Sequence, residues 1–177
     1  TITVSVNDAT SDNDYDPVVD QSVTVTLTND DTAGVTITQT SGTTTTTEGT
    51  TTDTYTVVLT AEPSVGGTTV AVTITPDSNS SVGAGNGTPI DLTFTNLNWN
   101  TPQTVTVTPN DDNIVNGTHT STITHAINTG LTTDTNYDAL IGLTTITNTI
   151  TDNDTASFIL SKTTSTVAEN AGTDTFT

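Results

Sequence analysis

A short acidic sequence occurs twice in this chain, and its recurrence restricts the fold more than any other feature. Asn-Asp-Asp-Thr-Ala-Gly occupies residues 29–34 and Asp-Asn-Asp-Thr-Ala-Ser occupies residues 152–157, so that Asp31 and Asp154 lie 123 residues apart. Each copy follows one strand-like run and precedes another. Self-similarity at a fixed spacing indicates a repeat architecture, in which one structural unit is used again along the chain.

Sequence similarity extends on both sides of these two junctions. Residues 1–4 (Thr-Ile-Thr-Val) align with residues 122–125 (Thr-Ile-Thr-His), and residues 52–56 (Thr-Asp-Thr-Tyr-Thr) align with residues 173–177 (Thr-Asp-Thr-Phe-Thr). The predicted parts of the tandem array are residues 1–31 as the C-terminal strands of a preceding repeat, residues 32–154 as one complete repeat, and residues 155–177 as the first strands of the following repeat. Partial sheets leave strand edges unpaired, so we interpret the sequence as a segment of a longer array, whose repeats are either one polypeptide or separate subunits.

Apolar and hydroxyl side chains alternate along much of the chain, which predicts β-strands. A period of two residues means that one face of each strand is buried and the other is wet. Threonine, the most frequent residue, is β-branched and suits an extended backbone. The clearest runs lie at residues 1–6, 23–27, 35–38, 70–74 and 105–108.

Clusters of turn-forming residues, such as residues 76–80 and 83–87, separate these strands. Many short strands joined in this way predict an all-β fold, an immunoglobulin-like antiparallel β-sandwich. The run of five threonines at residues 43–47 is expected to be a strand or crossover with a solvent-exposed surface. The side chains expected to point into the core are Tyr55, Val57, Leu59, Val72, Ile74, Phe94, Val105, Val107 and Ile123.

The charge of the chain restricts its possible partners. Asp and Glu total 20, Lys162 is the single basic residue, and the net charge is −19. Binding of nucleic acid through its phosphates requires Lys and Arg, and an anionic membrane surface would repel this chain. The absence of cysteine excludes disulfides and thiolate metal sites, and no apolar run reaches the length of a membrane span. A cation is the partner that fits this charge.

Several motifs occur in a characteristic order along the complete repeat. They are Glu48-Gly49, Leu-Thr-Phe-Thr at residues 92–95, Asn-Trp-Asn at residues 98–100, the acidic stretch at residues 110–118, Tyr137-Asp138 and the acidic end at residues 151–154. In this order the set resembles the Calx-β repeats of large bacterial surface proteins, and the resemblance covers the complete repeat and both partial ones. It implies an immunoglobulin-like sandwich that binds Ca²⁺ at one tip, in an extracellular or cell-surface protein.

The same resemblance implies a set of calcium ligands. Glu48 follows the first strand, Asp111 and Asp112 follow a central strand, and Asp152 and Asp154 end the last strand. Asn116 stands where members of the family often carry an acidic residue, so it would supply a neutral oxygen. The equivalent positions of the partial repeats are Asp30, Asp31 and Glu169.

General chemistry supports this ligand set independently of the family. Ca²⁺ takes six to eight hard oxygen ligands, preferably carboxylates and carbonyls. Strand ends at one pole of a sandwich bring distant residues together, and carboxylates gathered in this way repel one another unless a cation lies between them. The alternative is that Asp and Asn simply favour turns, and we assign Asp77, Asp91, Asp134 and Asp138 to that class as solvated loop residues.

Two histidines raise a different metal hypothesis. His119 and His125 would face the same side of one strand, but Val4 replaces His125 in the earlier copy. A surface or partly buried structural role is therefore the preferred interpretation of both. Trp99 is interpreted as an anchor in the core or at its rim.

No nucleophile, base and oxyanion-stabilising group occur together in the sequence, so we predict that the protein is not an enzyme. The first functional hypothesis is a structural repeat of an extracellular filament or adhesin stalk, with Ca²⁺ stiffening each junction and neighbouring repeats as partners. The alternative hypothesis is a binding module that recognises a glycan or a protein through its loops. A calcium-regulated sensor domain is a third possibility, implied by the family alone.

Overall fold

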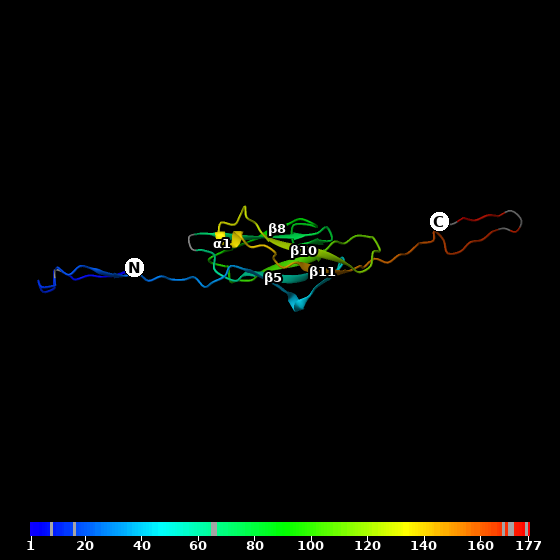
Figure 1. Ribbon diagram of the computed structural model, residues 1–177. Coiled ribbons are helices and arrows are strands. Elements are labelled where there is room, and N and C mark those ends of the chain that lie inside the picture. The colour runs from blue at the N-terminus through cyan, green and yellow to red at the C-terminus, as the bar shows by residue number, and fades with distance from the viewer. Residues whose placement is uncertain (8, 16, 65–66, 168, 170–171, 176) are drawn as a thin grey trace. The chain divides into compact units, whose positions relative to one another are not determined.

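A computed structural model describes residues 1–7, 9–15, 17–64, 67–167, 169, 172–175 and 177. These residues form two compact units, Thr1–Asp31 and Thr32–Thr177. The second unit contains an all-β sandwich, whose strands lie within the predicted complete repeat (Figure 1). The sequence-based prediction of an all-β, largely antiparallel sandwich is thereby confirmed.

Two sheets make up the sandwich. The five-stranded sheet has the order β4 (Thr44–Thr47), β11 (Ile146–Thr151), β10 (His119–Ile127), β6 (Thr69–Pro76) and β8 (Ile90–Thr95). The four-stranded sheet has the order β3 (Val35–Gln39), β5 (Asp53–Leu59), β9 (Gln103–Pro109) and β7 (Ser80–Ser81). Two short helical turns complete the unit, η1 (Thr40–Gly42) and α1 (Thr135–Asp138). Among the residues that the structure describes, all strand pairs are antiparallel except β4 and β11, which are parallel.

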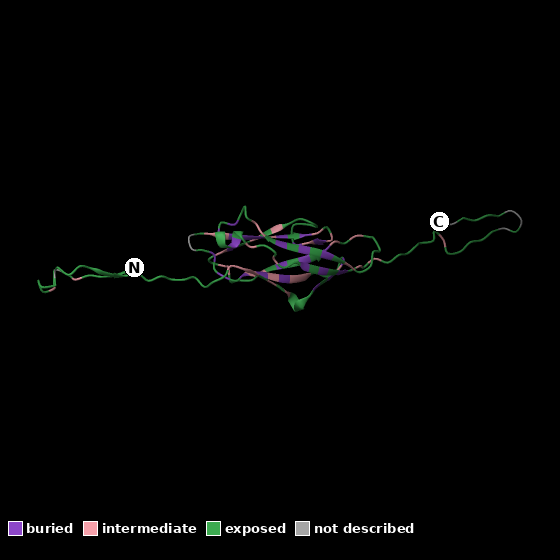
Figure 2. Cartoon of the chain, in the orientation of Figure 1, coloured by how far each residue is buried: buried purple, intermediate pink, exposed green. Residues whose placement is uncertain are grey.

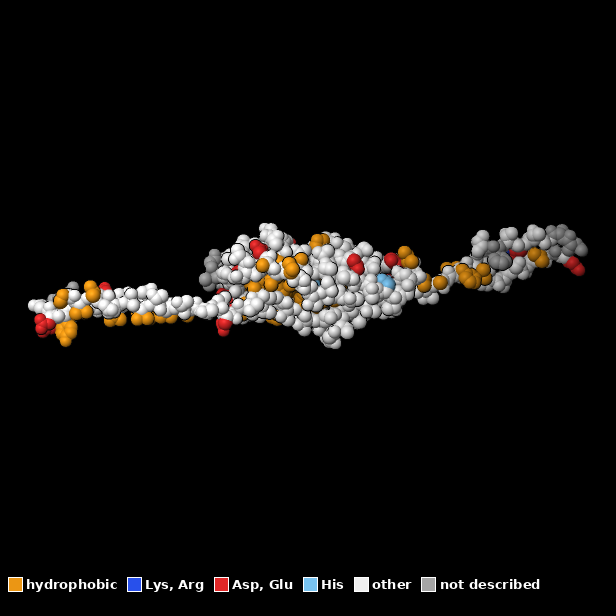
Figure 3. Space-filling model, viewed as in Figure 1, with side chains coloured by type: hydrophobic (Ala, Val, Ile, Leu, Met, Phe, Trp, Pro, Cys, Tyr) orange, Lys and Arg blue, Asp and Glu red, His pale blue; other side chains and the backbone are white. Residues whose placement is uncertain are grey.

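The core lies between the two sheets, and the alternation of the sequence positions it. All nine side chains predicted to point inward are buried, with at most 3% of any of them exposed. Along β9 and β10 buried and exposed residues alternate almost without interruption (Figure 2). The exposed positions of β9 and β11 carry Thr, and few charged side chains appear on the visible face of the sandwich (Figure 3). Trp99 packs against the rim of the core, as expected.

Strand β4 departs from the expectation of a wet threonine run. Thr45 is exposed, but Thr44 and Thr46 are buried. The hydroxyl of Thr44 donates to Gln39 (2.8 Å), and Thr46 exchanges hydrogen bonds with the buried side chain of Asn148 on β11 (3.2 and 2.9 Å). The expectation was wrong for these two positions because β4 lies beside β11, where alternate side chains must face the core.

Two further buried polar groups stabilise the sandwich from within. The hydroxyl of Tyr55 lies 2.8 Å from Nε2 of His125, whose Nδ1 lies 2.7 Å from the carbonyl oxygen of Thr144. Since a carbonyl can only accept, Nδ1 carries the proton, and Nε2 accepts from the tyrosine hydroxyl. His125 is therefore a buried structural residue, in line with the preferred interpretation of the sequence.

Asp134 corrects another expectation, because it is buried and is not a solvated loop residue. Its carboxylate caps α1 by accepting from the main-chain N–H of Asn136 (2.9 Å), and it also accepts from the N–H of Ser64 (2.5 Å). An aspartate at an N-cap satisfies helix N–H groups that would otherwise lack partners. Asp77 is half-buried and accepts hydrogen bonds from Ser121 and Thr122 (2.6 and 2.7 Å), so it is also more than a turn residue.

The described residues of the first unit, Thr1–Asp31, form one pair of antiparallel strands, β1 (Ile2–Val4) and β2 (Gln21–Val23). The alternating run at residues 23–27 was expected to be a strand, but only Val23 lies in one. In the second unit, the described part of residues 155–177 contains no strand, and its large apolar side chains are exposed.

The described residues include no helix with the length and apolar character that a bilayer crossing requires.

Candidate metal centre

The carboxylates at the predicted site come from the ends of two neighbouring strands. Glu48 directly follows β4, and Asp152 and Asp154 follow β11, the parallel partner of β4. Because paired parallel strands end at the same edge of a sheet, these residues meet although they are about a hundred positions apart in the sequence. The main-chain N–H of Glu48 continues the ladder by donating to the carbonyl of Thr151 (3.1 Å).

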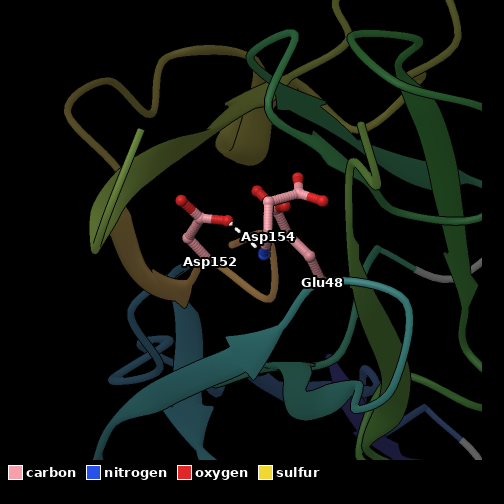
Figure 4. Close-up of side chains that lie close together, drawn as sticks. All are labelled: Glu48, Asp152 and Asp154. Carbon is pink, nitrogen blue, oxygen red and sulfur yellow. Dashed lines mark hydrogen bonds between the residues drawn. The ribbon is translucent and has the colours of Figure 1, made fainter. Parts of the chain in front are cut away.

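Three carboxylates converge at this edge. Glu48, Asp152 and Asp154 each offer one oxygen, and these oxygens all lie within 4.8 Å of one another (Figure 4). Glu48 is buried, with 1% of it exposed, and the other two are half-buried. Among the described residues this is the one group of three or more His, Cys, Asp or Glu side chains with such spacing.

Two oxygens in the cluster are buried without any hydrogen-bond partner, Oε2 of Glu48 and Oδ2 of Asp154. Buried polar atoms nearly always have a partner, because leaving a carboxylate oxygen dry and unpaired is costly. By contrast, both oxygens of Asp152 accept bonds: Oδ2 from the main-chain N–H of Asn116 (2.8 Å) and Gly117 (2.6 Å), and Oδ1 from that of Asp154 (2.7 Å). Asp152 is thus held in position, whereas Glu48 and Asp154 have unused acceptor capacity.

The pKa shifts divide the three acids in the same way, with Asp152 on one side and Glu48 and Asp154 on the other. Burial raises the pKa of Glu48, and the charges of Asp112 and Asp152 raise it further. Partial burial and the charge of Asp152 likewise raise the pKa of Asp154. The pKa of Asp152 is lowered, first by the hydrogen bond from Asp154 and then by the one from Gly117. A cation in the cluster would therefore relieve strain at Glu48 and Asp154, the two acids with unpaired oxygens.

The remaining predicted ligands lie around this cluster. Asp111 approaches Asn153, whose side-chain amide donates to it (3.4 Å) and to the carbonyl of Glu48 (3.0 Å). The negative charge of Asp112 raises the pKa of Glu48, and the carboxylate of Asp112 accepts a hydrogen bond from the main-chain N–H of Ile114 (2.7 Å). Asn116 contacts the cluster through its main-chain N–H to Asp152.

The equivalent positions of the partial repeats carry no such cluster among the described residues. Asp30 and Asp31 lie at the end of the first unit, and both are exposed, as is Glu169 in the second. Asp31 donates its main-chain N–H to the side chain of Asn29 (3.1 Å). Their role as partial sites stays a prediction.

Three residues contribute to the centre that the sequence reasoning did not include. Asn153 bridges Glu48 and Asp111. His119 places Nε2 3.6 Å from Oε1 of Glu48 while its Nδ1 lies 2.9 Å from the carbonyl of Gly117. Gly49 has a φ of +62°, and a Cβ there would lie 2.9 Å from the carboxylate of Asp111. The Glu-Gly pair was visible in the sequence, but the need for glycine depends on Asp111, which arrives from a distant loop.

Comparison with known proteins gives one kind of match. No protein-family model matches the chain, and no curated protein sequence does. Similar solved structures include the apo form of the Calx CBD1 domain, with a TM-score of 0.44 and 19% identity over 68% of this chain and 98% of that one. The calcium-binding domain CBD12 of CALX1.1 gives 0.44 and 19% over 67% of this chain and 45% of that one, and CBD12 of CALX1.2 gives 0.42 and 18% over 67% and 44%. The case for a metal here therefore stands on the oxygen atoms of this chain.

Proposed function

We propose that the sandwich is a Ca²⁺-binding structural repeat of an extracellular filament or adhesin stalk, in which the metal stiffens the junction that follows β11. The observation that supports this function best is the pair of buried, unpartnered oxygens on Glu48 and Asp154. They belong to the group of three carboxylates that each place one oxygen within 4.8 Å of the others. A cation is the partner that would satisfy both oxygens at once.

The donor set favours calcium over other cations. The three clustered side chains offer carboxylate oxygen, and Asp111 and Asp112 lie near them, so that hard oxygen ligands dominate. Ca²⁺ accepts six to eight such ligands in flexible geometry, whereas Mg²⁺ requires a near-ideal octahedron and structural Zn²⁺ prefers Cys and His. Glu48, Asp152 and Asp154 would hold the ion, and the ion would supply positive charge to a site that has an excess of negative charge.

The position of the cluster explains how a metal would act on the junction. Asp152 and Asp154 lie on the segment that leaves the sandwich, and Glu48 lies on the turn after β4. An ion held by all three would tie that exit segment to the body of the sandwich. Neutralising the cluster would also remove repulsion between repeats of a chain whose net charge is −19. The alternative hypothesis of a glycan- or protein-binding module stays a prediction.

Thermal unfolding with added ions tests the proposal. Millimolar Ca²⁺ should raise the melting temperature of the chain above its value in chelator. At a hundredfold excess over Kd, binding should increase the free energy of unfolding by about 2.7 kcal/mol. Mg²⁺ should have a smaller effect. Asp154→Asn should abolish most of the calcium effect, and Asp138→Asn, an exposed aspartate on α1, should leave it unchanged. Equal melting in Ca²⁺ and chelator for the unaltered chain would contradict the proposal.

A further inference from the structure

Strands β1 and β2 pair in the same register as two strands of the sandwich. Ile2 stands opposite Val23 in the first unit, and Ile123 stands opposite Ile146 in the sandwich. In the sequence alignment Ile2 corresponds to Ile123 and Val23 to Ile146, since the spacing is 121 residues before the loop and 123 after it. The first unit thus reproduces the β10–β11 pair without the strands that cover that pair in the sandwich.

The inner face of this pair is uncovered. In the sandwich Ile123, Ile146 and Ile150 are each at most 1% exposed. Their counterparts in the sequence alignment, Ile2 and Val23 in the strand pair and Leu27 beyond the end of β2, are 60%, 62% and 92% exposed. Exposed apolar surface of this kind marks a site of interaction. In the sandwich the four-stranded sheet covers the equivalent face, while β4 and β6 pair with the two edges of the β10–β11 pair.

Two positions on this face differ in chemistry between the two copies. Val4 stands in place of His125, and Val25 stands in place of Asn148. In the sandwich these two polar residues have specific buried partners: His125 accepts from Tyr55, and Asn148 bonds to Thr46 and Ser80. A covering structure identical to that of the sandwich would therefore bury the hydroxyls of Tyr55 and Thr46 against valine, without partners.

The C-terminal partial repeat carries the matching changes. Its sequence has Val167 at the position of Thr46 and Phe176 at the position of Tyr55, in the alignment that pairs Glu48 with Glu169. Phe176 lies outside the described residues, so this comparison rests on the sequence. Two polar pairs in the complete repeat, His125 with Tyr55 and Asn148 with Thr46, thus correspond to two apolar pairs divided between the ends of the chain. Coupled changes of this kind preserve hydrogen-bond satisfaction on both sides of a contact.

We propose that the apolar face of residues 1–31 docks onto the part of a neighbouring repeat that corresponds to residues 35–109, strands β3 to β9, and that carries apolar residues at the positions of Tyr55 and Thr46. Residues 155–177 have apolar residues at these two positions. The same face discriminates against residues 35–109 of the complete repeat, where both positions are polar. The array would therefore contain two kinds of sandwich, one with polar core pairs and one with apolar pairs. This inference rests on the proposed repeat organisation and is independent of calcium.

An extended chain tests the proposal. A second copy of residues 32–121 is placed directly before Thr1, so that Ser121 of the added copy is followed by the counterpart of Thr122, and all 177 residues remain. The added copy and residues 1–31 can then form a hybrid sandwich beside the original one. Amide hydrogen exchange at residues 23–28 reports the hybrid, and exchange at residues 146–151 reports the original, within one sample.

The decisive observation is that the same two changes have opposite effects on amide exchange in the two sandwiches. Tyr55→Phe and Thr46→Val, made together in the added copy, should slow exchange at residues 23–28 at least tenfold and raise the melting temperature of the hybrid by about 4 °C or more. The same two changes made in the original copy should speed exchange at residues 146–151, because His125 then loses the hydroxyl of Tyr55 and Asn148 loses that of Thr46. Ser80 has no counterpart in residues 155–177 and stays unchanged in both arms.

Controls separate this result from general effects of threonine replacement and from calcium. Thr38→Val, at an exposed position of β3, should change neither hybrid nor original sandwich. Loss of protection in both copies, or unprotected residues 23–28 in every version, would overturn the proposal. The measurements are made both in Ca²⁺ and in chelator. If the paired changes still have opposite effects in the two sandwiches but Ca²⁺ stabilises neither, the proposed metal function alone is refuted.

Discussion

At the scale of single residues, Glu48 combines two properties that conflict in the absence of a cation. It is buried, with 1% of it exposed, and one of its oxygens has no hydrogen-bond partner. Burial and the neighbouring aspartates raise its pKa, which means that its ionised form is disfavoured in the folded protein. His119, 3.6 Å away, offsets only part of this cost.

Glu48→Gln should therefore have opposite effects with and without calcium. In chelator at pH 7 the variant should melt at a higher temperature than the unaltered chain, because an amide carries no charge to desolvate. In millimolar Ca²⁺ it should melt at a lower temperature, since the ion loses a ligand and most of the stabilisation of about 2.7 kcal/mol that binding gives at a hundredfold excess over Kd. Calorimetry in both conditions checks this, with the exposed Glu62→Gln as the matched control. A lower melting temperature in chelator would contradict the account of Glu48.

His125 predicts a separate dependence on pH. Burial lowers the pKa of His125 below the ordinary value of 6.5, because the protonated ring is poorly solvated there, and the hydrogen bond to the carbonyl of Thr144 offsets part of this shift. The unfolded chain then binds the proton more readily than the folded one, so stability falls as the pH drops through 6.5 and continues to fall until the lower folded pKa is reached. The slope from one such group is at most about 1.4 kcal/mol per pH unit.

Denaturant unfolding of the chain between pH 7.5 and pH 5, in chelator, measures this slope. His125→Gln removes the titrating ring and should flatten the dependence around pH 6.5, although it lowers stability at pH 7.5. A parallel series with His119→Gln, which replaces the other histidine of the chain, serves as the comparison. An unchanged slope in the His125 variant would contradict the prediction.

At the scale of elements, the sequence predicted strands and their inward faces well, because period-two alternation is local. It failed where burial depends on a distant partner. Thr44 and Thr46 look like surface threonines until β11 lies beside them with Asn148. Asp134 looks like a turn residue until Ser64 and α1 surround it.

The candidate site shows the same division. The resemblance to Calx-β repeats implied five acidic ligands, and three of them form the cluster. Asn153 and His119 were missed because their contacts with Glu48 follow from the pairing of β4, β10 and β11, which no local pattern encodes.

The turn between β4 and β5 supports a prediction with a close internal control. Gly49 and Gly42 both have positive φ, +62° and +84°, but a Cβ at Gly49 would lie 2.9 Å from Asp111, whereas none would meet an atom within 4 Å at Gly42. Both alanine variants should lose about 1 kcal/mol from the left-handed backbone. Gly49→Ala should lose more, and it alone should weaken Ca²⁺ binding, because Asp111 must move. Isothermal titration with Ca²⁺ and chemical unfolding distinguish the two; equal losses in both assays would contradict the role of Gly49.

At the scale of the whole molecule, the proposed calcium centre predicts how an array of repeats behaves. A polypeptide with two or more repeats should be extended in millimolar Ca²⁺, and in chelator it should become flexible and sensitive to protease near Asp154. The reason is mutual repulsion of the carboxylates, about 1 kcal/mol for each like pair at about 4 Å in water and more at a protein surface. Small-angle scattering in both conditions measures the change.

Asp112→Ala combined with Asp154→Ala should reproduce the dimensions seen in chelator even when Ca²⁺ is present, while the isolated sandwich stays folded. The same pair of changes at Asp91 and Asp138, which lie outside the cluster, should leave the array extended. Identical dimensions in Ca²⁺ and chelator for the unaltered array would contradict the proposed stiffening.

The parallel pairing of β4 with β11 has a mechanical consequence. These strands lie near the start and at the end of the sandwich, with Thr44 opposite Asn148 and Thr47 opposite Thr151. Tension along the chain would first load β3, which pairs with β5 in the other sheet. Once it reached β4 and left through β11, it would pull the two parallel strands in opposite directions along their length. All the hydrogen bonds between them would then bear the load together and would have to break nearly at once, whereas strands peeled apart from one end lose them singly. A sandwich connected in this way should resist stretching far more strongly than its thermal stability alone suggests.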